Sequence, residues 1–181
     1  MTGTKRKKML SPDEIDAAVA EVASLVEIEG IHVALVGGSA LALYGSDRFT
    51  ADIAFVADAA LRALPKESAL VFGGYQSHTP GGVPVDWILR SDDFTELYEE
   101  ALLKAKRLPG VPVPVVTPEY LAAMKLVAGR GKDELDLETM LEGGLVDVAA
   151  ATALIKRLLG AYAAKEFSSR VDLAEWKKSR R

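Results

Sequence analysis

The sequence contains no cysteine and only two histidines in 181 residues. The absence of cysteine excludes disulfides, thiolate zinc sites and thiol nucleophiles, and two scattered histidines, His32 and His78, exclude a histidine-rich metal cluster. Any metal ion must therefore be held by oxygen ligands. No apolar stretch is long enough to cross a bilayer, and the basic N-terminus is not followed by the apolar run of a signal peptide. We therefore expect a soluble, cytoplasmic protein with no membrane partner.

Basic residues without acids are concentrated in two tails, residues 1–10 and 177–181, although the net charge of the chain is −4. The sequence between the tails is therefore more acidic than the net charge indicates, which disfavours broad, nonspecific binding of nucleic acid. The tails themselves allow contact with RNA phosphates, but solvated ends are the more frequent explanation of such segments.

Hydrophobic residues make up 49% of the chain, which is ample for a sizeable core. Their spacing predicts helices over 11–30, 39–44, 58–64, 94–105 and 117–129, strands over 31–36, 52–56, 69–72 and 83–89, a turn over 77–82 and an extended edge strand over 111–116. Helical patterns continue over 132–141, 146–159 and 163–176. We therefore predict a core over 11–131 and a C-terminal helical group over 132–176.

A glycine pair, Gly37 and Gly38, lies where the strand over 31–36 is expected to run into a helix. Glycine lets the backbone approach a ligand closely, and N–H groups at the start of a helix favour a phosphate. Ser39 adds a hydroxyl group. The motif predicts phosphate binding, although a simple tight turn is the more frequent explanation of a glycine pair taken alone.

Two aspartates accompany this turn on separate predicted strands. Asp52 opens the strand over 52–56, and Asp86 lies between the apolar residues Val85 and Trp87. Because an acid among apolar neighbours is costly to bury, Asp86 is either a ligand for a metal ion or a surface residue on a half-exposed strand. Residues i and i+2 of a strand share a face, so a second carboxylate beside Asp52 would stand at position 54, where the sequence has Ala54.

The segment Gly38-Ser39, followed after twelve residues by Asp52-Ile53-Ala54-Phe55, resembles the minimal nucleotidyltransferases of the DNA polymerase beta superfamily. The stretch 119–137 is similar to the second signature of the AbiEii-type toxins and related nucleotidyltransferase domains. The resemblance implies an α+β fold with a mixed β-sheet flanked by helices. It also implies Mg²⁺, a nucleoside triphosphate donor and a hydroxyl acceptor, which in toxin members is RNA, notably the acceptor end of tRNA.

Carried over to this chain, the resemblance implies a role for each motif residue. Metal would be ligated by Asp52 and Asp86, and the second acid of the pair is replaced by Ala54. The nucleotide would be held by Gly37, Gly38, Ser39, Arg48 and Lys125, with Lys125 neutralising phosphate charge. Asp133 would act as an acid near the acceptor or orient Lys125. A solvated helical face with salt bridges is the alternative explanation of the charges over 125–136.

Ala54 is the departure from the family pattern, because a methyl group cannot ligate a metal ion. Asp58 is no substitute, because six residues of strand from Asp52 span about 20 Å at roughly 3.3 Å per residue. The chain is therefore expected to be inactive or impaired. Either a natural member lost its activity, or an Asp→Ala change silenced a harmful enzyme, and we favour the second origin.

Three functions follow from the sequence. The leading hypothesis is a nucleotidyltransferase toxin that modifies RNA and is paired with an antitoxin protein or belongs to a phage-defence pair. The second is nucleotidylation of a protein or of a small molecule such as an aminoglycoside. The third is a degenerate domain that binds a nucleotide or a partner protein without turnover.

Overall fold

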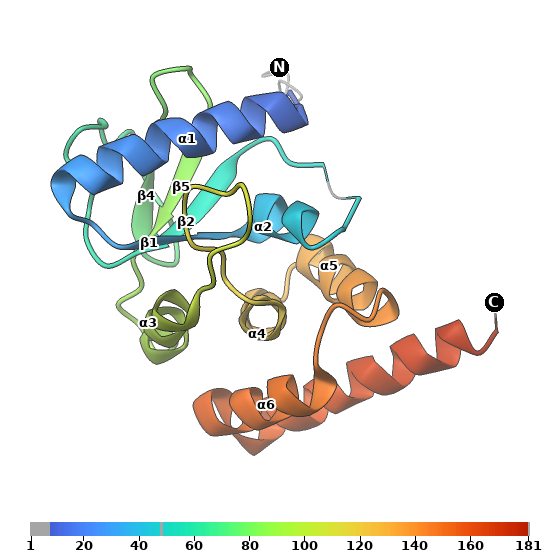
Figure 1. Ribbon diagram of the computed structural model, residues 1–181. Coiled ribbons are helices and arrows are strands. Elements are labelled where there is room, and N and C mark those ends of the chain that lie inside the picture. The colour runs from blue at the N-terminus through green and yellow to red at the C-terminus, as the bar shows by residue number, and fades with distance from the viewer. Residues whose placement is uncertain (1–7, 48, 181) are drawn as a thin grey trace, which may run out of the picture.

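The computed structural model describes residues 8–47 and 49–180 of the chain. Figure 1 shows a layered arrangement, in which α1 lies along one face of a central β-sheet, α3 and α4 lie on its other side, and α6 lies beyond α4. The elements follow the order α1 (Pro12–Glu29), β1 (Val33–Val36), α2 (Gly37–Leu43), β2 (Ile53–Ala57), β3 (Ser68–Ala69), β4 (Gly74–His78), β5 (Pro84–Ile88), α3 (Thr95–Lys104), α4 (Pro118–Ala128), α5 (Gly131–Glu142) and α6 (Val148–Lys178).

The first helix has strong local signals at both ends. The Ser11 hydroxyl accepts the N–H of Glu14, and the Glu14 carboxylate accepts the N–H of Ser11, which together form a capping box. Gly30 ends the helix with a φ of 67°, a conformation that glycine adopts without steric cost. Because these signals are contained in the sequence itself, the predicted helix over 11–30 is confirmed.

The sheet has the strand order β1-β2-β5-β4-β3. Strands β2 and β5 are parallel, whereas the pairs β1–β2, β5–β4 and β4–β3 are antiparallel. The expectation of an α+β fold with a mixed sheet flanked by helices is therefore confirmed. The buried rings of Phe55, Trp87 and Tyr75 stack across the three central strands, with centroid distances of 5.5 and 6.2 Å.

Side chains alternate between the two faces of a sheet, so the face opposite these rings carries a different row of register partners. This row crosses all five strands and consists of Val36, Ala54, Asp86, Gln76 and Ser68. Apart from Val36, these residues (Ala54, Asp86, Gln76 and Ser68) are called the cross-sheet row below.

The predicted helix over 58–64 is wrong. The backbone N–H groups of Arg62 and Ala63 donate to the Glu29 carboxylate of α1, and the N–H of Leu61 donates to the Tyr75 hydroxyl. These donors are therefore used by distant side chains instead of by carbonyl groups four residues earlier. Tertiary contacts have overridden the helix propensity of an alanine- and leucine-rich segment.

The predicted strand over 69–72 and the predicted turn over 77–82 also need correction. The predicted strand over 69–72 is wrong beyond Ala69, because the chain turns there between β3 and β4. The predicted turn over 77–82 begins too early, because Ser77 and His78 belong to β4. This arrangement requires glycine at position 74, because a Cβ there would lie 1.9 Å from the Trp87 carbonyl oxygen. The predicted edge strand over 111–116 is reduced to β-bridges at Val115, because the neighbouring prolines Pro112 and Pro114 lack the N–H groups that a ladder needs.

The C-terminal residues form the expected helical group, in which α5 and α6 pack against α4 and against each other. The two predicted segments over 146–159 and 163–176 run together in α6, which is interrupted at Gly160. Over the described residues, no helix combines the length and the apolar character that crossing a membrane requires.

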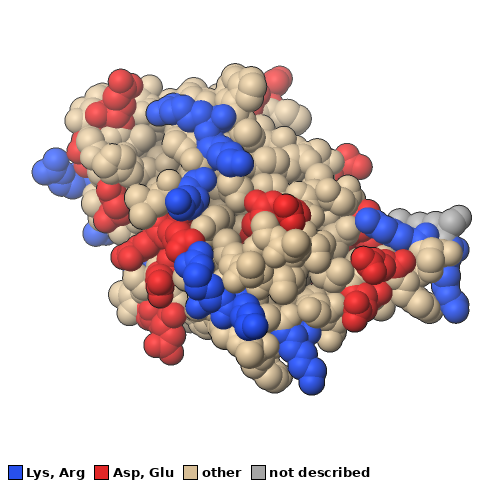
Figure 2. All heavy atoms as spheres, turned by 60° about the horizontal axis from the view of Figure 1, so that its bottom comes forward, with Lys and Arg blue, Asp and Glu red and all other residues tan. Residues whose placement is uncertain are grey.

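Figure 2 shows the face that turns forward from the lower side of Figure 1. Lysine and arginine side chains follow a broken band across it, and aspartate and glutamate side chains gather beside that band. Both signs of charge therefore alternate over this face, which makes its electrostatic field mixed.

Candidate functional site

Ala54 and Asp86 are direct register partners on the two parallel strands at the centre of the sheet. Both residues are half-buried. Register partners on adjacent strands point to the same face, so the methyl group of Ala54 stands beside the carboxylate of Asp86. The two positions that the motif singles out are thus brought together.

The glycine turn adjoins the same place. Val36 is the register partner of Ala54, and the chain passes from Val36 directly into α2 at Gly37. A Cβ at Gly37 would lie 3.6 Å from the Cβ of Ala54, and the φ of Gly37 is 70°. The start of α2, Ala54 and Asp86 therefore lie in succession along one side of the sheet.

Ser39 lies within α2 and is only 1% exposed. Its hydroxyl donates to the Val36 carbonyl oxygen over 3.4 Å. The hydroxyl is therefore directed toward the backbone of β1, and binding of a phosphate by Ser39 stays a prediction, as it does for Gly37 and Gly38.

Asp52 precedes the first residue of β2 and is half-buried. The Thr50 hydroxyl donates to the Asp52 carbonyl oxygen over 2.7 Å and lies 3.5 Å from a carboxylate oxygen of Asp52. This contact fixes the backbone where the chain enters β2. Arg48, the predicted nucleotide contact, lies outside the described residues.

The carboxylates present do not fit the magnesium site that the family resemblance implies. Magnesium requires a nearly complete shell of oxygen ligands, whereas Ala54, beside Asp86, supplies only a methyl group. Over residues 8–47 and 49–180, no group of three or more histidine, aspartate or glutamate side chains is arranged to hold a metal ion. Asp52 and Asp86 as metal ligands therefore stay a prediction from the sequence.

Lys125 lies in a buried ion cluster between α4 and α5. Its ammonium group is 2.8 Å from Asp133 Oδ1 and 2.6 Å from Asp136 Oδ2, and the exposed fractions of Lys125, Asp133 and Asp136 are 9%, 0% and 4%. Arg130 reaches the second oxygen of Asp133 over 2.5 Å. Lys125, Asp133 and Asp136 are thus packed in the interior, unlike the solvated face considered above, whereas Arg130 and Lys132 are exposed. Asp133 forms an ion pair with Lys125, and its roles near the acceptor or in orienting Lys125 stay predictions.

The pKa of Asp133 reflects two opposing causes. Burial raises the pKa of this carboxyl, but hydrogen bonds from Arg130 and Lys125 outweigh burial and place the pKa below its ordinary value. Asp133 is therefore ionised at neutral pH, and the cluster contains two carboxylates and two cations.

Gln76 is a residue of the site that the sequence did not reveal. Its amide nitrogen donates to Asp86 Oδ1 over 2.6 Å, and its amide oxygen accepts from the Ser68 hydroxyl over 3.1 Å. The predicted turn over 77–82 obscured the strand that carries it. No local signal in the sequence marks Gln76, because its place beside Asp86 depends on the pairing of β4 with β5.

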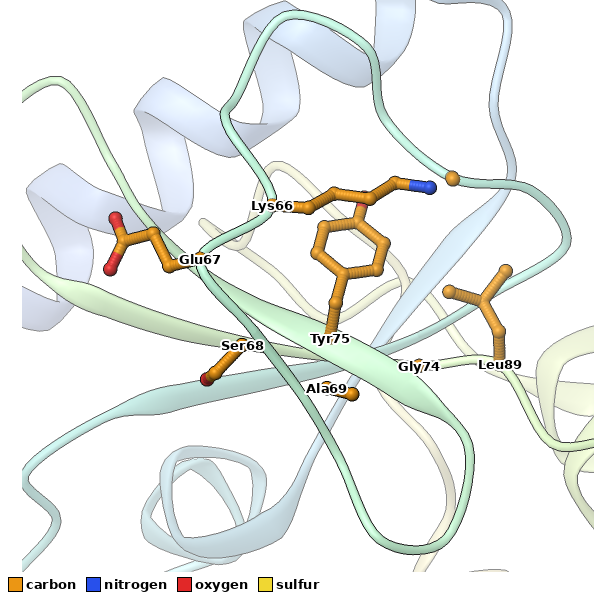
Figure 3. A pocket seen from close by; sticks show the side chains of 8 residues that line it. Lys66, Glu67, Ser68, Ala69, Gly74, Tyr75 and Leu89 are labelled. Carbon is orange, nitrogen blue, oxygen red and sulfur yellow. The ribbon is translucent and has the colours of Figure 1, made fainter.

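A surface pocket of about 480 Å³ lies elsewhere, against the chain that leads into β3 (Figure 3). The Lys66 side chain extends across the Tyr75 ring in Figure 3, with its nitrogen 5.0 Å from the ring centroid. The lining consists of Ala60, Lys66, Glu67, Ser68, Ala69, Gly74, Tyr75 and Leu89. Among the described residues, none of those predicted for phosphate or metal lines this pocket.

No family model and no curated protein matches the chain. The solved structures that are similar to it include the following two. An antigenic nucleotidyltransferase-like protein from Paracoccidioides brasiliensis is 20% identical, with a TM-score of 0.49 over 91% of this chain and 95% of that one. The antibiotic-resistance factor ANT(2'')-Ia is 13% identical, with a TM-score of 0.47 over 94% of this chain and 100% of that one. At these values, similarity identifies neither a family nor an activity.

Proposed function

We propose that this chain is a domain of the nucleotidyltransferase type whose ability to transfer a nucleoside monophosphate is impaired by Ala54. The observation that carries the proposal is the register of β2 and β5, which puts Ala54 beside Asp86, next to the glycine turn of α2. This register supports the proposal, because it brings the position of the missing carboxylate beside Asp86.

Position 54 is the place where one added carboxylate would most change the chemistry. An aspartate there would stand beside Asp86 on the same face of the sheet, and two residues after Asp52. Acidic side chains that share a site in this way are the ligands that hard divalent cations prefer. The present chain, with a methyl group at this position, would keep the nucleotide site and lose most of the turnover.

The test is to restore the acid with Ala54→Asp. The variant is incubated with Mg²⁺, each labelled nucleoside triphosphate, and either total tRNA, a protein extract or an aminoglycoside. We expect label transfer at least about 100-fold above that of the unchanged chain, because metal-assisted charge stabilisation is worth several kcal/mol. Ala54→Asn is the matched control, because it adds a side chain of the same size without the charge.

The acceptor separates the candidate functions. We favour RNA, with the chain as the toxin of a pair, because the stretch 119–137 is similar to the second signature of toxin members. Growth arrest on expression of Ala54→Asp, and normal growth on expression of Ala54→Asn, would support this role. Label on an aminoglycoside or on a protein would assign the second function instead.

A binding domain without turnover is the remaining candidate, and Ala54 itself favours it. This candidate predicts that the unchanged chain binds a nucleoside triphosphate and that Ala54→Asp transfers label to none of the acceptors. A folded Ala54→Asp variant without any transfer would contradict the transferase proposal.

A further inference from the structure

Gln76 is the only carboxamide side chain in the sequence, which contains one glutamine and no asparagine. The fold places this residue on β4, directly beside Asp86 and on the side of β5 away from Ala54. Asp86 therefore has a methyl group on one neighbouring strand and an amide on the other.

The contact between Gln76 and Asp86 is short and has a defined direction. A donor to an ionised carboxylate forms a stronger hydrogen bond than a donor to a neutral acceptor, and 2.6 Å lies at the short end for such a bond. An amide can bind in either of two orientations. The Ser68 hydroxyl donates to the amide oxygen of Gln76 over 3.1 Å, which leaves the NH₂ group for Asp86.

Ser68 and Gln76 are register partners, as are Gln76 and Asp86, so the sheet itself holds the three side chains in line. One oxygen of Asp86 is thereby held toward β4, and this fixes the angle of the carboxylate relative to position 54. Outer groups that orient an acid by hydrogen bonding commonly determine how well that acid functions.

We infer that Gln76 is a positioning residue that sets the orientation of the Asp86 carboxylate, and that Ser68 fixes the orientation of the Gln76 amide. The inference has a structural half, which is the orientation of Asp86, and a functional half, which is the effect of that orientation on nucleotidyl transfer. Only the functional half rests on the proposed function. The structural half is testable without any activity.

Nuclear magnetic resonance tests the structural half on the unchanged chain. Because Gln76 is the only carboxamide residue, its side-chain NH₂ group gives the single pair of such signals in a ¹⁵N correlation spectrum. We expect one of its two protons to be protected from exchange, and the protection to disappear in Asp86→Ala. The three-bond couplings of Asp86 should show one rotamer, which becomes averaged in Gln76→Met, a variant of similar length without a donor.

An unprotected NH₂ group in the unchanged chain would overturn the inference, as would an Asp86 side chain that keeps one rotamer in Gln76→Met. His32→Leu is the matched control, because it removes a side-chain contact of 2.7 Å to an exposed aspartate, Asp58, remote from the cross-sheet row. This control should leave both the amide signals and the Asp86 rotamer unchanged.

Kinetics in the Ala54→Asp background test the functional half. We expect Gln76→Met to lower kcat about 10- to 100-fold, with KM for the triphosphate changed less than threefold, and Ser68→Ala to lower kcat by a smaller factor. A residue with a purely structural role would lower thermal stability and leave kcat per folded molecule unchanged, and that result would overturn the functional half. A complete lack of transfer by Ala54→Asp would contradict the proposed function while the spectroscopic result stands.

Discussion

Lys125 is held between two buried carboxylates, Asp133 and Asp136, where water cannot stabilise either charge. Such a cluster gains little stability over an apolar replacement of all its members, because burial of the charges costs about as much as their attraction returns. Removal of one member is different. The remaining charges stay buried and lose an ion pair, so the cluster holds α4 and α5 in one arrangement.

Lys125→Met should therefore destabilise the protein by about 3–5 kcal/mol, because two buried carboxylates would each lose an ion pair. Urea unfolding at neutral pH measures the change. Lys132→Met is the matched control, because it removes an exposed lysine at the start of α5 and should change the free energy of unfolding by less than about 0.5 kcal/mol.

The same pair of variants tests whether Lys125 also neutralises phosphate charge. Weaker nucleotide binding by Lys125→Met without any loss of stability would contradict the role of Lys125 in the ion cluster. A loss of stability with unchanged nucleotide affinity of the folded fraction would assign Lys125 to structure alone.

At the scale of elements, Gly160 is the irregular point of α6. Its backbone angles are φ 90° and ψ 175°, a conformation that residues with a side chain essentially never adopt. A Cβ at this position would meet no atom within 4 Å. The requirement for glycine therefore comes from the backbone and not from packing.

Gly160→Ala should destabilise the protein by about 1–3 kcal/mol, the usual cost of a strained backbone conformation, unless the two halves of α6 straighten. Gly131→Ala is a closely matched control, because Gly131 is helical and a Cβ there also meets no atom within 4 Å. This substitution should be neutral or stabilise by up to about 1 kcal/mol. Equal effects of the two substitutions in thermal unfolding would show that the backbone at Gly160 is not restricted.

Elements were predictable from the sequence where their signals are local. The capping box at Ser11, the glycine at position 30 and the apolar spacing between them predict α1 almost to the residue. Segment 58–64 was not predictable, because the groups that satisfy its N–H donors, Glu29 and Tyr75, lie far away in the sequence. For the same reason, Asp86 could be singled out from the sequence and Gln76 could not. Asp86 stands out among its apolar neighbours, whereas the role of Gln76 depends on the pairing of β4 with β5.

At the scale of the whole molecule, Glu100 joins three helices. Its carboxylate accepts two hydrogen bonds from the Arg157 guanidinium of α6, over 2.5 and 2.8 Å, and a third from the Tyr120 hydroxyl of α4 over 2.5 Å. Glu100 itself belongs to α3. The helix that packs beside the sheet is thereby fastened to the C-terminal helical group.

This junction should make stability depend on pH. Hydrogen bonds from Arg157 and Tyr120 lower the pKa of Glu100 from 4.5 to about 2 in the folded protein. A lowered pKa means that the unfolded chain binds the proton more readily, so the stabilisation is complete above pH 5 and is lost as pH falls from about 4.5 toward 2. Burial raises the pKa of Tyr120, and the hydrogen bond to the Glu100 carboxylate raises it further, to about 12.

Glu100→Gln should accordingly cost up to about 1 kcal/mol at pH 6, the range measured for partly exposed ion pairs, and the cost should shrink steadily between pH 4.5 and pH 2. Urea unfolding of both proteins at a series of pH values measures the difference. Glu99→Gln is the control, because it removes an exposed carboxylate from the preceding position of α3. This variant should change the free energy of unfolding by less than Glu100→Gln does. A cost of Glu100→Gln that stays constant down to pH 2 would mean that packing, and not the charge of the junction, holds α3 to α6.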